Sequence, residues 1–152
     1  MFEGVIWGLP SILPYADDIL DMSKSGAQEG DGGYFHGGWR AGHNICPQMS
    51  GRPPAATYLN RIAPLFHGAA NKHVLAAAEC YARATEAWHE FDRQLSRARE
   101  ESGHDHTEAS TDPAHRKAGA AAVRQAHDHE KDAIAQIAEA LDALSNLGAQ
   151  RQ

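Results

Sequence analysis

The chain lacks three features that would assign it to a class early: a disulfide framework, a long apolar run and an excess of positive charge. Its two cysteines, Cys46 and Cys80, are too few for a disulfide framework and lack the spacing of a zinc finger. No stretch approaches the roughly 20 apolar residues of a membrane span. Glu3 stands where a secretory signal carries positive charge, so we expect no signal peptide and favour a cytoplasmic protein or part of a soluble assembly.

Positive charge is scarce as well. The chain has 14 Lys and Arg against 20 Asp and Glu, a formal net charge of -6. Because binding to phosphates requires a basic face, nucleic acid is not an expected partner. No Ser-His-Asp or Cys-His arrangement is apparent, so the chain is not predicted to be an enzyme.

Two long segments have a helical pattern with signals at both ends. In the second of them, residues 113–147, Asp112 is placed to cap the helix, Pro113 occupies the first helical position and Gly148 follows the end. Steps of three and four alternate along its seam, so the seam residues share one face. The seam consists of Ala120, Val123, His127, Glu130, Ile134, Ile137, Leu141 and Leu144.

The first long segment, residues 72–101, follows the same rule. Asn71 is the expected N-cap, and Gly103 follows the expected end. Charged pairs such as Glu79 with Arg83 lie on the opposite, solvated face. Its seam consists of Val74, Ala77, Tyr81, Ala84, Trp88, Phe91, Leu95 and Ala98.

Because a short loop joins the two segments, they are predicted to pack as a long antiparallel helical hairpin in an all-α fold. The register that best sets small residues against large ones places Trp88 beside Glu130 and Val74 beside Leu144. Alanines flank both seams and widen the apolar surface. One hairpin is therefore incomplete, and either the N-terminal segment or a second copy must cover this surface. We expect self-association, the simplest way to bury it, to complete a coiled-coil-like bundle.

The hairpin spans residues 71–148, and the rest of the chain divides around it. Residues 1–54 are predicted to form an irregular arm rich in glycine and proline, apart from a short helix over residues 15–22. Residues 55–70 are predicted to form a short helix and connector, and residues 149–152 a tail. The arm is rich in aromatic and other apolar residues, and it is expected to dock on its own chain or on a partner. Its candidate docking residues are Trp7, Tyr34, Phe35 and Trp39.

A polar layer interrupts the seam of the second long helix. His127 and Glu130 are expected to hydrogen-bond to each other, helped by Trp88 Nε1–H, and to lie beside Phe91. Such a layer commonly fixes register or oligomeric state. Two alternatives are a partly hydrated layer at the bundle edge and a metal or proton-transfer site completed by a second copy. If the layer fixes assembly, protonation of His127 would make the assembly pH-dependent.

A second set of residues has the spacing of a carboxylate-bridged di-iron helix. Glu86-x-x-His89 lies one heptad after Glu79. On a helical wheel Glu79 and Glu86 lie about 180° from Trp88, which places them on the solvated face. No cofactor is therefore predicted. A divalent metal held by Glu79, Glu86, His89, His127 and Glu130 belongs to an alternative hypothesis.

These patterns together favour a non-enzymatic structural or protein–protein interaction protein. The predicted partners are a second copy of the chain, another protein, or both. Subunits or accessory factors of larger assemblies, such as virus particles and secretion systems, use this plan. The alternative is a metal-binding, ferritin-like bundle with an oxidoreductase or metal-storage role.

Overall fold

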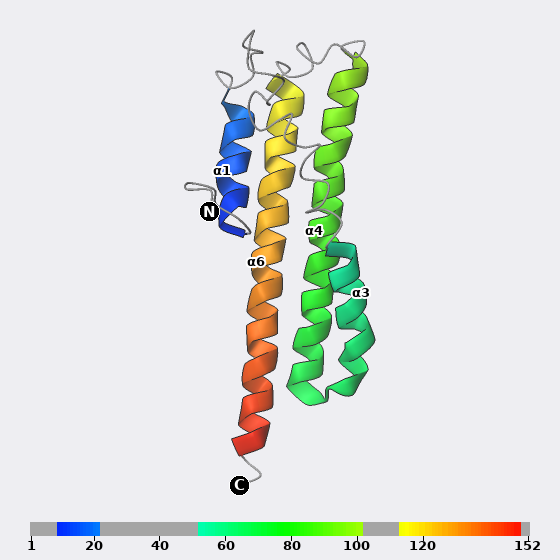
Figure 1. Ribbon diagram of the computed structural model, residues 1–152, viewed down its shortest axis with the longest axis vertical. Helices are drawn as coiled ribbons and strands as arrows, with labels where there is room; N and C mark the ends of the chain where they lie inside the picture. Colours follow the sequence, from blue (N-terminus) through cyan, green and yellow to red (C-terminus); the bar gives the residue numbers. More distant parts are fainter. Residues whose placement is uncertain (1–8, 22–51, 102–112, 150–152) are drawn as a thin grey trace, which may run out of the picture.

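The computed structural model describes residues 9–21, 52–101 and 113–149 (Figure 1). All regular structure in these three ranges is helical, which confirms the all-α fold class. The elements are α1 (Leu9–Leu20), α3 (Arg52–Ile62), the 3-10 helix η2 (Ala63–Leu65), α4 (Gly68–Glu101) and α6 (Pro113–Ala149). Within the same ranges, every helix is too short or too polar to cross a bilayer.

The two long helices, α4 and α6, lie side by side in opposite directions and form the most extensive contact between described elements (Figure 1). Helix α1 packs along the part of α6 near its N-terminus, and α3 packs along the part of α4 near its N-terminus. We call α1 with the neighbouring residues 85–101 and 113–129 the upper half. The lower half consists of α3, η2 and residues 68–84 and 130–149.

The upper half has a core of large side chains from three helices. Trp88 and Phe91 meet edge to face, with ring centroids 6.2 Å apart, and Tyr15 of α1 meets Phe91 at 5.9 Å in the same manner. The face that α1 presents to this core has a helical spacing and is fully buried. It consists of Ile12, Ala16 and Ile19.

Arg116 of α6 holds the C-terminal end of α1 in place. Its side chain is almost fully buried, at 1% exposure. The guanidinium donates from Nε to the carbonyl of Ile19 at 2.6 Å and from Nη2 to the carbonyl of Asp21 at 3.0 Å. Carbonyls at the end of a helix have no partner within the helix, so a buried cation there satisfies both hydrogen bonding and the helix dipole.

The two short helices, α1 and α3, begin earlier in the chain than the prolines in the sequence led us to expect. Helix α1 was expected from residue 15 but begins at Leu9, with Pro14 inside it. Helix α3 begins at Arg52 and contains Pro53 and Pro54 in its first turn, a region predicted to be irregular. Prolines cost little in a first turn because the N–H groups there have no helical acceptor. Pro14 lies only five residues after Leu9, and burial of the α1 face offsets its missing bond.

Helix α4 also begins before its expected cap. It starts at Gly68, whose φ of 61° lies in the left-handed region that favours glycine. Asn71 therefore lies inside the helix, where its Nδ2 donates to the carbonyl of Ala63 in η2 at 2.7 Å. The predicted α4 seam is otherwise confirmed, because seven of its eight residues are buried and Tyr81 is half-buried.

The predicted α6 seam is wrong in the lower half. Ile134, Leu141 and Leu144 are 49%, 59% and 37% exposed, whereas Ala133 and Ala140 are buried. The predicted register is also wrong, by about one heptad. It would place His73 near Ser145, but His73 Nδ1 lies 2.9 Å from Gln136 Oε1. The prediction matched side-chain sizes between two helices only, whereas α1 and α3 supply part of the packing.

Candidate functional site

Glu130 lies at the centre of a polar cluster that joins three helices. Arg52, the first residue of α3, donates from Nε to Oε1 at 2.9 Å and from Nη2 to Oε2 at 2.8 Å. Trp88 of α4 donates from Nε1 to Oε1 at 2.9 Å. The guanidinium carbon of Arg52 also lies 5.7 Å from the centroid of the Trp88 ring, within the range of a cation–π contact.

This cluster is built to hold helices together. Glu130 is buried, and the side chains of Arg52 and Glu130 are 15% and 10% exposed. The carboxylate accepts three hydrogen bonds, two of them from one guanidinium, and so connects α3 and α4 to α6. Tyr81 lies close enough to respond to the cluster: burial raises the pKa of its hydroxyl, Glu130 raises it further and Arg52 opposes the rise.

The other residues of the predicted polar layer lie elsewhere. His127 Nδ1 is 3.1 Å from Asp128 Oδ1, so the predicted bond between His127 and Glu130 is wrong. Phe91 belongs to the aromatic core of the upper half. The bond from Trp88 to Glu130 forms in spite of the register error, because helical side chains lean toward their own N-terminus. Because α4 and α6 are antiparallel, the side chains of Trp88 and Glu130 tilt toward each other.

Sequence reasoning missed Arg52, the main partner of Glu130. The two residues are 78 positions apart, so no helical spacing relates them. Arg52 also precedes two prolines, which made its segment look irregular. The only available signal was chemical: a buried carboxylate on the α6 seam requires a cation from somewhere in the chain.

The residues of the metal-binding alternative do not converge. Glu79 forms an ion pair with Arg83, and Glu86 and His89 are exposed. Glu79 and Glu86 line a shallow groove with His129 of α6. Among the residues that the structure describes, no three His, Cys, Asp or Glu side chains are arranged to hold a metal ion.

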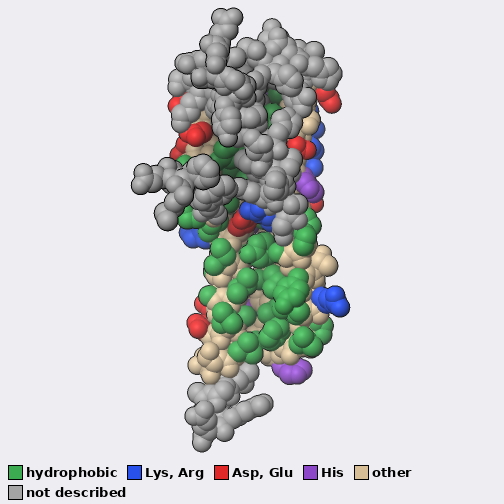
Figure 2. Space-filling view, in the orientation of Figure 1, with side chains coloured by type: hydrophobic (Ala, Val, Ile, Leu, Met, Phe, Trp, Pro, Cys, Tyr) green, Lys and Arg blue, Asp and Glu red, His purple; other side chains and the backbone are tan. Residues whose placement is uncertain are grey.

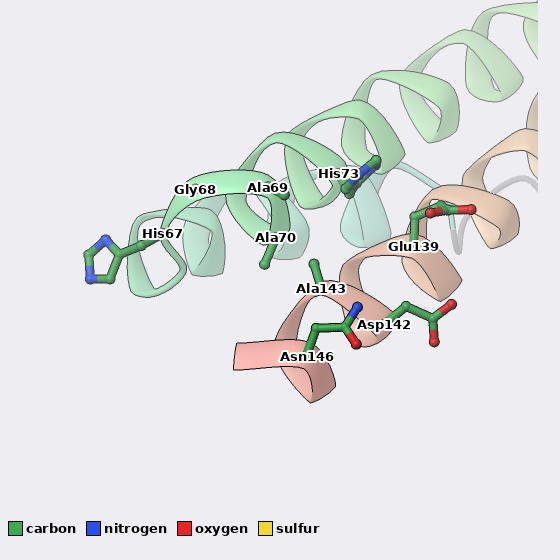
Figure 3. Close-up of a pocket in the computed structure, with 9 residues that line it drawn as sticks. All are labelled: His67, Gly68, Ala69, Ala70, His73, Glu139, Asp142, Ala143 and Asn146. Carbon is green, nitrogen blue, oxygen red and sulfur yellow. The ribbon is translucent and has the colours of Figure 1, made fainter. Parts of the chain in front are cut away.

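A second groove, of about 500 Å³, lies between the start of α4 and the end of α6 (Figure 3). Ala70 and Ala143 form its apolar part, and Glu139 and Asp142 lie along α6. His67 points away from these residues (Figure 3). Its imidazole therefore does not approach the two carboxylates. His73 also lines the groove, and its Nδ1 lies 2.9 Å from Gln136 Oε1.

The most distinctive surface of the described ranges is apolar. Hydrophobic side chains gather over the lower half in Figure 2. Two sets contribute large exposed residues with helical spacing. We call Tyr58, Ile62 and Leu65 the α3 stripe, in which Tyr58 and Leu65 are 61% and 76% exposed and Ile62 is half-buried against the core of the lower half. We call Ile134, Ala138 and Leu141 the α6 stripe.

The candidate docking residues Trp7, Tyr34, Phe35 and Trp39 lie outside the described residues. The described part of the N-terminal region, α1, docks on its own chain. Comparison with known proteins found no family model, no curated protein and no solved structure that matches this chain.

Proposed function

We propose that this chain is a non-enzymatic structural or interaction protein that self-associates through its lower half. In this proposal the hairpin is completed to a coiled-coil-like bundle and serves as a subunit or accessory factor of a larger assembly, such as a virus particle or a secretion system. The observation that carries the proposal is the exposure of the α3 stripe, where Leu65 and Tyr58 are the two most exposed large hydrophobic residues described.

The α3 stripe suits contact with another copy. Tyr58, Ile62 and Leu65 are spaced by four and three residues, so they line one side of α3 and η2. Burial of apolar surface stabilises association by about 25 cal/mol per Å² before the entropy cost of binding. In a two-fold symmetric dimer the stripe of each copy would pack against the same stripe of the other copy, so both stripes would be buried. The aromatic ring of Tyr58 is also a residue type enriched at the centres of interfaces.

The test is the mass of the full chain in solution, measured by light scattering during gel filtration over a dilution series. We expect a multiple of 16.4 kDa that dissociates on dilution. Combined Tyr58→Glu and Leu65→Glu substitutions should shift the mass to that of the monomer, because two carboxylates would have to be desolvated at the interface.

The matched control is Leu13→Glu, which places the same charge at a leucine that is 40% exposed on α1 in the upper half. It should leave the mass unchanged. A wild-type chain that is monomeric at every concentration would overturn the proposal. Stoichiometric iron, manganese or zinc in the purified protein would favour the ferritin-like alternative in its place.

A further inference from the structure

The α6 stripe lies in line with the site where α1 docks. Five turns of an α-helix contain 18 residues, so residues 18 apart lie on the same side. Arg116, Ala120 and Val123, which are buried where α1 packs, have Ile134, Ala138 and Leu141 as their counterparts 18 positions later. The side of α6 that holds α1 in the upper half therefore continues as an exposed apolar stripe in the lower half.

The direction of α1 brings its N-terminal end to this stripe. Ile19 lies beside Arg116, and Asp17 forms an ion pair with Arg124 at 2.6 Å, so α1 and α6 are antiparallel. Leu9 is eight residues before Asp17, which is about 12 Å along the helix axis. The same rise along α6 from Arg124 leads to the turn immediately before Ile134. In Figure 1 the lower end of α1 accordingly lies beside the middle of α6.

The residues before α1 repeat the pattern of its docking face. Leu9 packs against the upper core, and Ile12, Ala16 and Ile19 are buried in it. Continuing this spacing backward from Leu9 in steps of four and three reaches Val5 and Phe2. Residues 1–8 also include Met1, Ile6 and Trp7 and contain a single charged side chain, Glu3.

We propose that residues 1–8 extend the α1 docking line along α6 and cover the α6 stripe of the same chain. Their reach is sufficient, because eight residues span about 12 Å as a helix and about 26 Å when extended. The stripe from Ile134 to Leu141 requires only about 10 Å. The segment has the composition for this contact, since five of its eight residues are apolar apart from glycine. This contact is independent of the α3 stripe, which stays open to a second copy.

Disulfide trapping tests the proposal. In the full chain with Cys46→Ser and Cys80→Ser, we would combine Val5→Cys with Ala138→Cys, the stripe residue nearest to Val5 when the line of α1 is continued, and oxidise the protein. We expect an intrachain disulfide, seen as a monomer of altered mobility that reverts on reduction. The matched control combines Val5→Cys with Lys117→Cys, an exposed position at the other end of α6, and should not cross-link within the chain.

The outcomes separate this inference from the proposed self-association. Covalent dimers formed through the cysteines at positions 5 and 138 would show that a neighbouring copy occupies the stripe, and would overturn the inference while supporting self-association. The inference would also be overturned if the intrachain disulfide of the test pair formed no faster than that of the control pair.

A second measurement does not depend on engineered disulfides. Leu141→Ser should lower the equilibrium constant for folding about tenfold in the full chain, because it removes a covered leucine. The same substitution should have little effect in a chain that lacks residues 2–8. Equal effects in the two backgrounds would contradict the contact.

Discussion

The upper and lower halves of the hairpin have the same helical pattern but different burial. In the upper half, α1 packs mainly on α6, its Tyr15 reaches Phe91 of α4, and Trp88, Phe91 and Val123 are buried together. In the lower half, α3 packs mainly on α4, and the buried residues are the smaller Ala63, Val74 and Ala140. The periodicity of α6 is equally regular in both halves. The third helix therefore decides which side of the pattern becomes core.

The two halves meet at a polar cluster that connects three helices. The cluster of Arg52, Trp88 and Glu130 lies where the two halves meet, because it joins the first residue of α3 to both long helices. Above it the packing is aromatic, and below it the packing is mostly by alanine. Substitutions should therefore be most costly at or above this cluster and mildest in the lower half.

The largest effect is expected for Trp88→Ala. Trp88 is 1% exposed, contacts Phe91 and donates a hydrogen bond to Glu130. Its removal should lower the free energy of unfolding by about 4 kcal/mol, because it leaves a large cavity and removes one of the hydrogen bonds that Glu130 accepts. The comparison is Leu75→Ala on the same helix in the lower half, where the side chain is 43% exposed and the loss should be about 1 kcal/mol. Urea denaturation of both variants measures the difference, and equal losses would refute the contrast between the halves.

Glu130→Ala should have the next largest effect. It leaves the guanidinium of Arg52 and the indole N–H of Trp88 without their acceptor, and breaking a buried pair in this way costs about 3 kcal/mol. Glu79→Ala provides the matched control, because it breaks the exposed pair with Arg83 and should cost less than about 1 kcal/mol. Chemical denaturation would show the difference. A loss from Glu130→Ala as small as that from the control would mean that the cluster does not hold the halves together.

Arg116→Met should act mainly on α1. The substitution keeps much of the buried stem but removes the two hydrogen bonds to the C-terminal carbonyls of α1, at a cost of about 2 kcal/mol. Amide hydrogen exchange should accelerate in α1 and leave the lower part of α4 unchanged. Arg124→Met, which removes the exposed pair with Asp17, serves as the control. Acceleration of equal size throughout the molecule would contradict a local role for Arg116.

The same division explains what the sequence could predict. The α4 seam was predictable because α4 buries the same side in both halves. The lower α6 seam was not, because Ile134 and Ala133 both fit a helical stripe and only the position of a third helix distinguishes them. Glu130 was predictable as a buried polar group. Arg52 was not, since an ion pair between residues 78 positions apart has no spacing in the sequence.

The smallest effect, and one that depends on pH, is expected for Tyr15. Its hydroxyl is buried and has no hydrogen-bond partner within the described structure. Burial raises the pKa of this hydroxyl well above its ordinary value of about 10, and Asp18 raises it further. The unfolded chain therefore releases the proton at a lower pH than the folded chain does. The contribution of the protonated Tyr15 hydroxyl to the free energy of unfolding is therefore complete below about pH 10. It is lost as the pH rises toward the pKa in the folded chain, by up to about 1.4 kcal/mol per pH unit.

Tyr15→Phe tests this interpretation directly. At neutral pH the variant should be as stable as the wild type or more stable by up to about 1 kcal/mol, because an unsatisfied hydroxyl is removed while the ring contact with Phe91 stays. Above about pH 10 its advantage should grow. Tyr81→Phe in the lower half is the control: burial also raises the pKa of Tyr81, but its half-exposed side chain should give a weaker dependence. Denaturation curves at neutral and alkaline pH compare the two. Parallel curves for wild type and Tyr15→Phe would show that the hydroxyl of Tyr15 reaches water, and that α1 is held less tightly against the upper core than its contacts indicate.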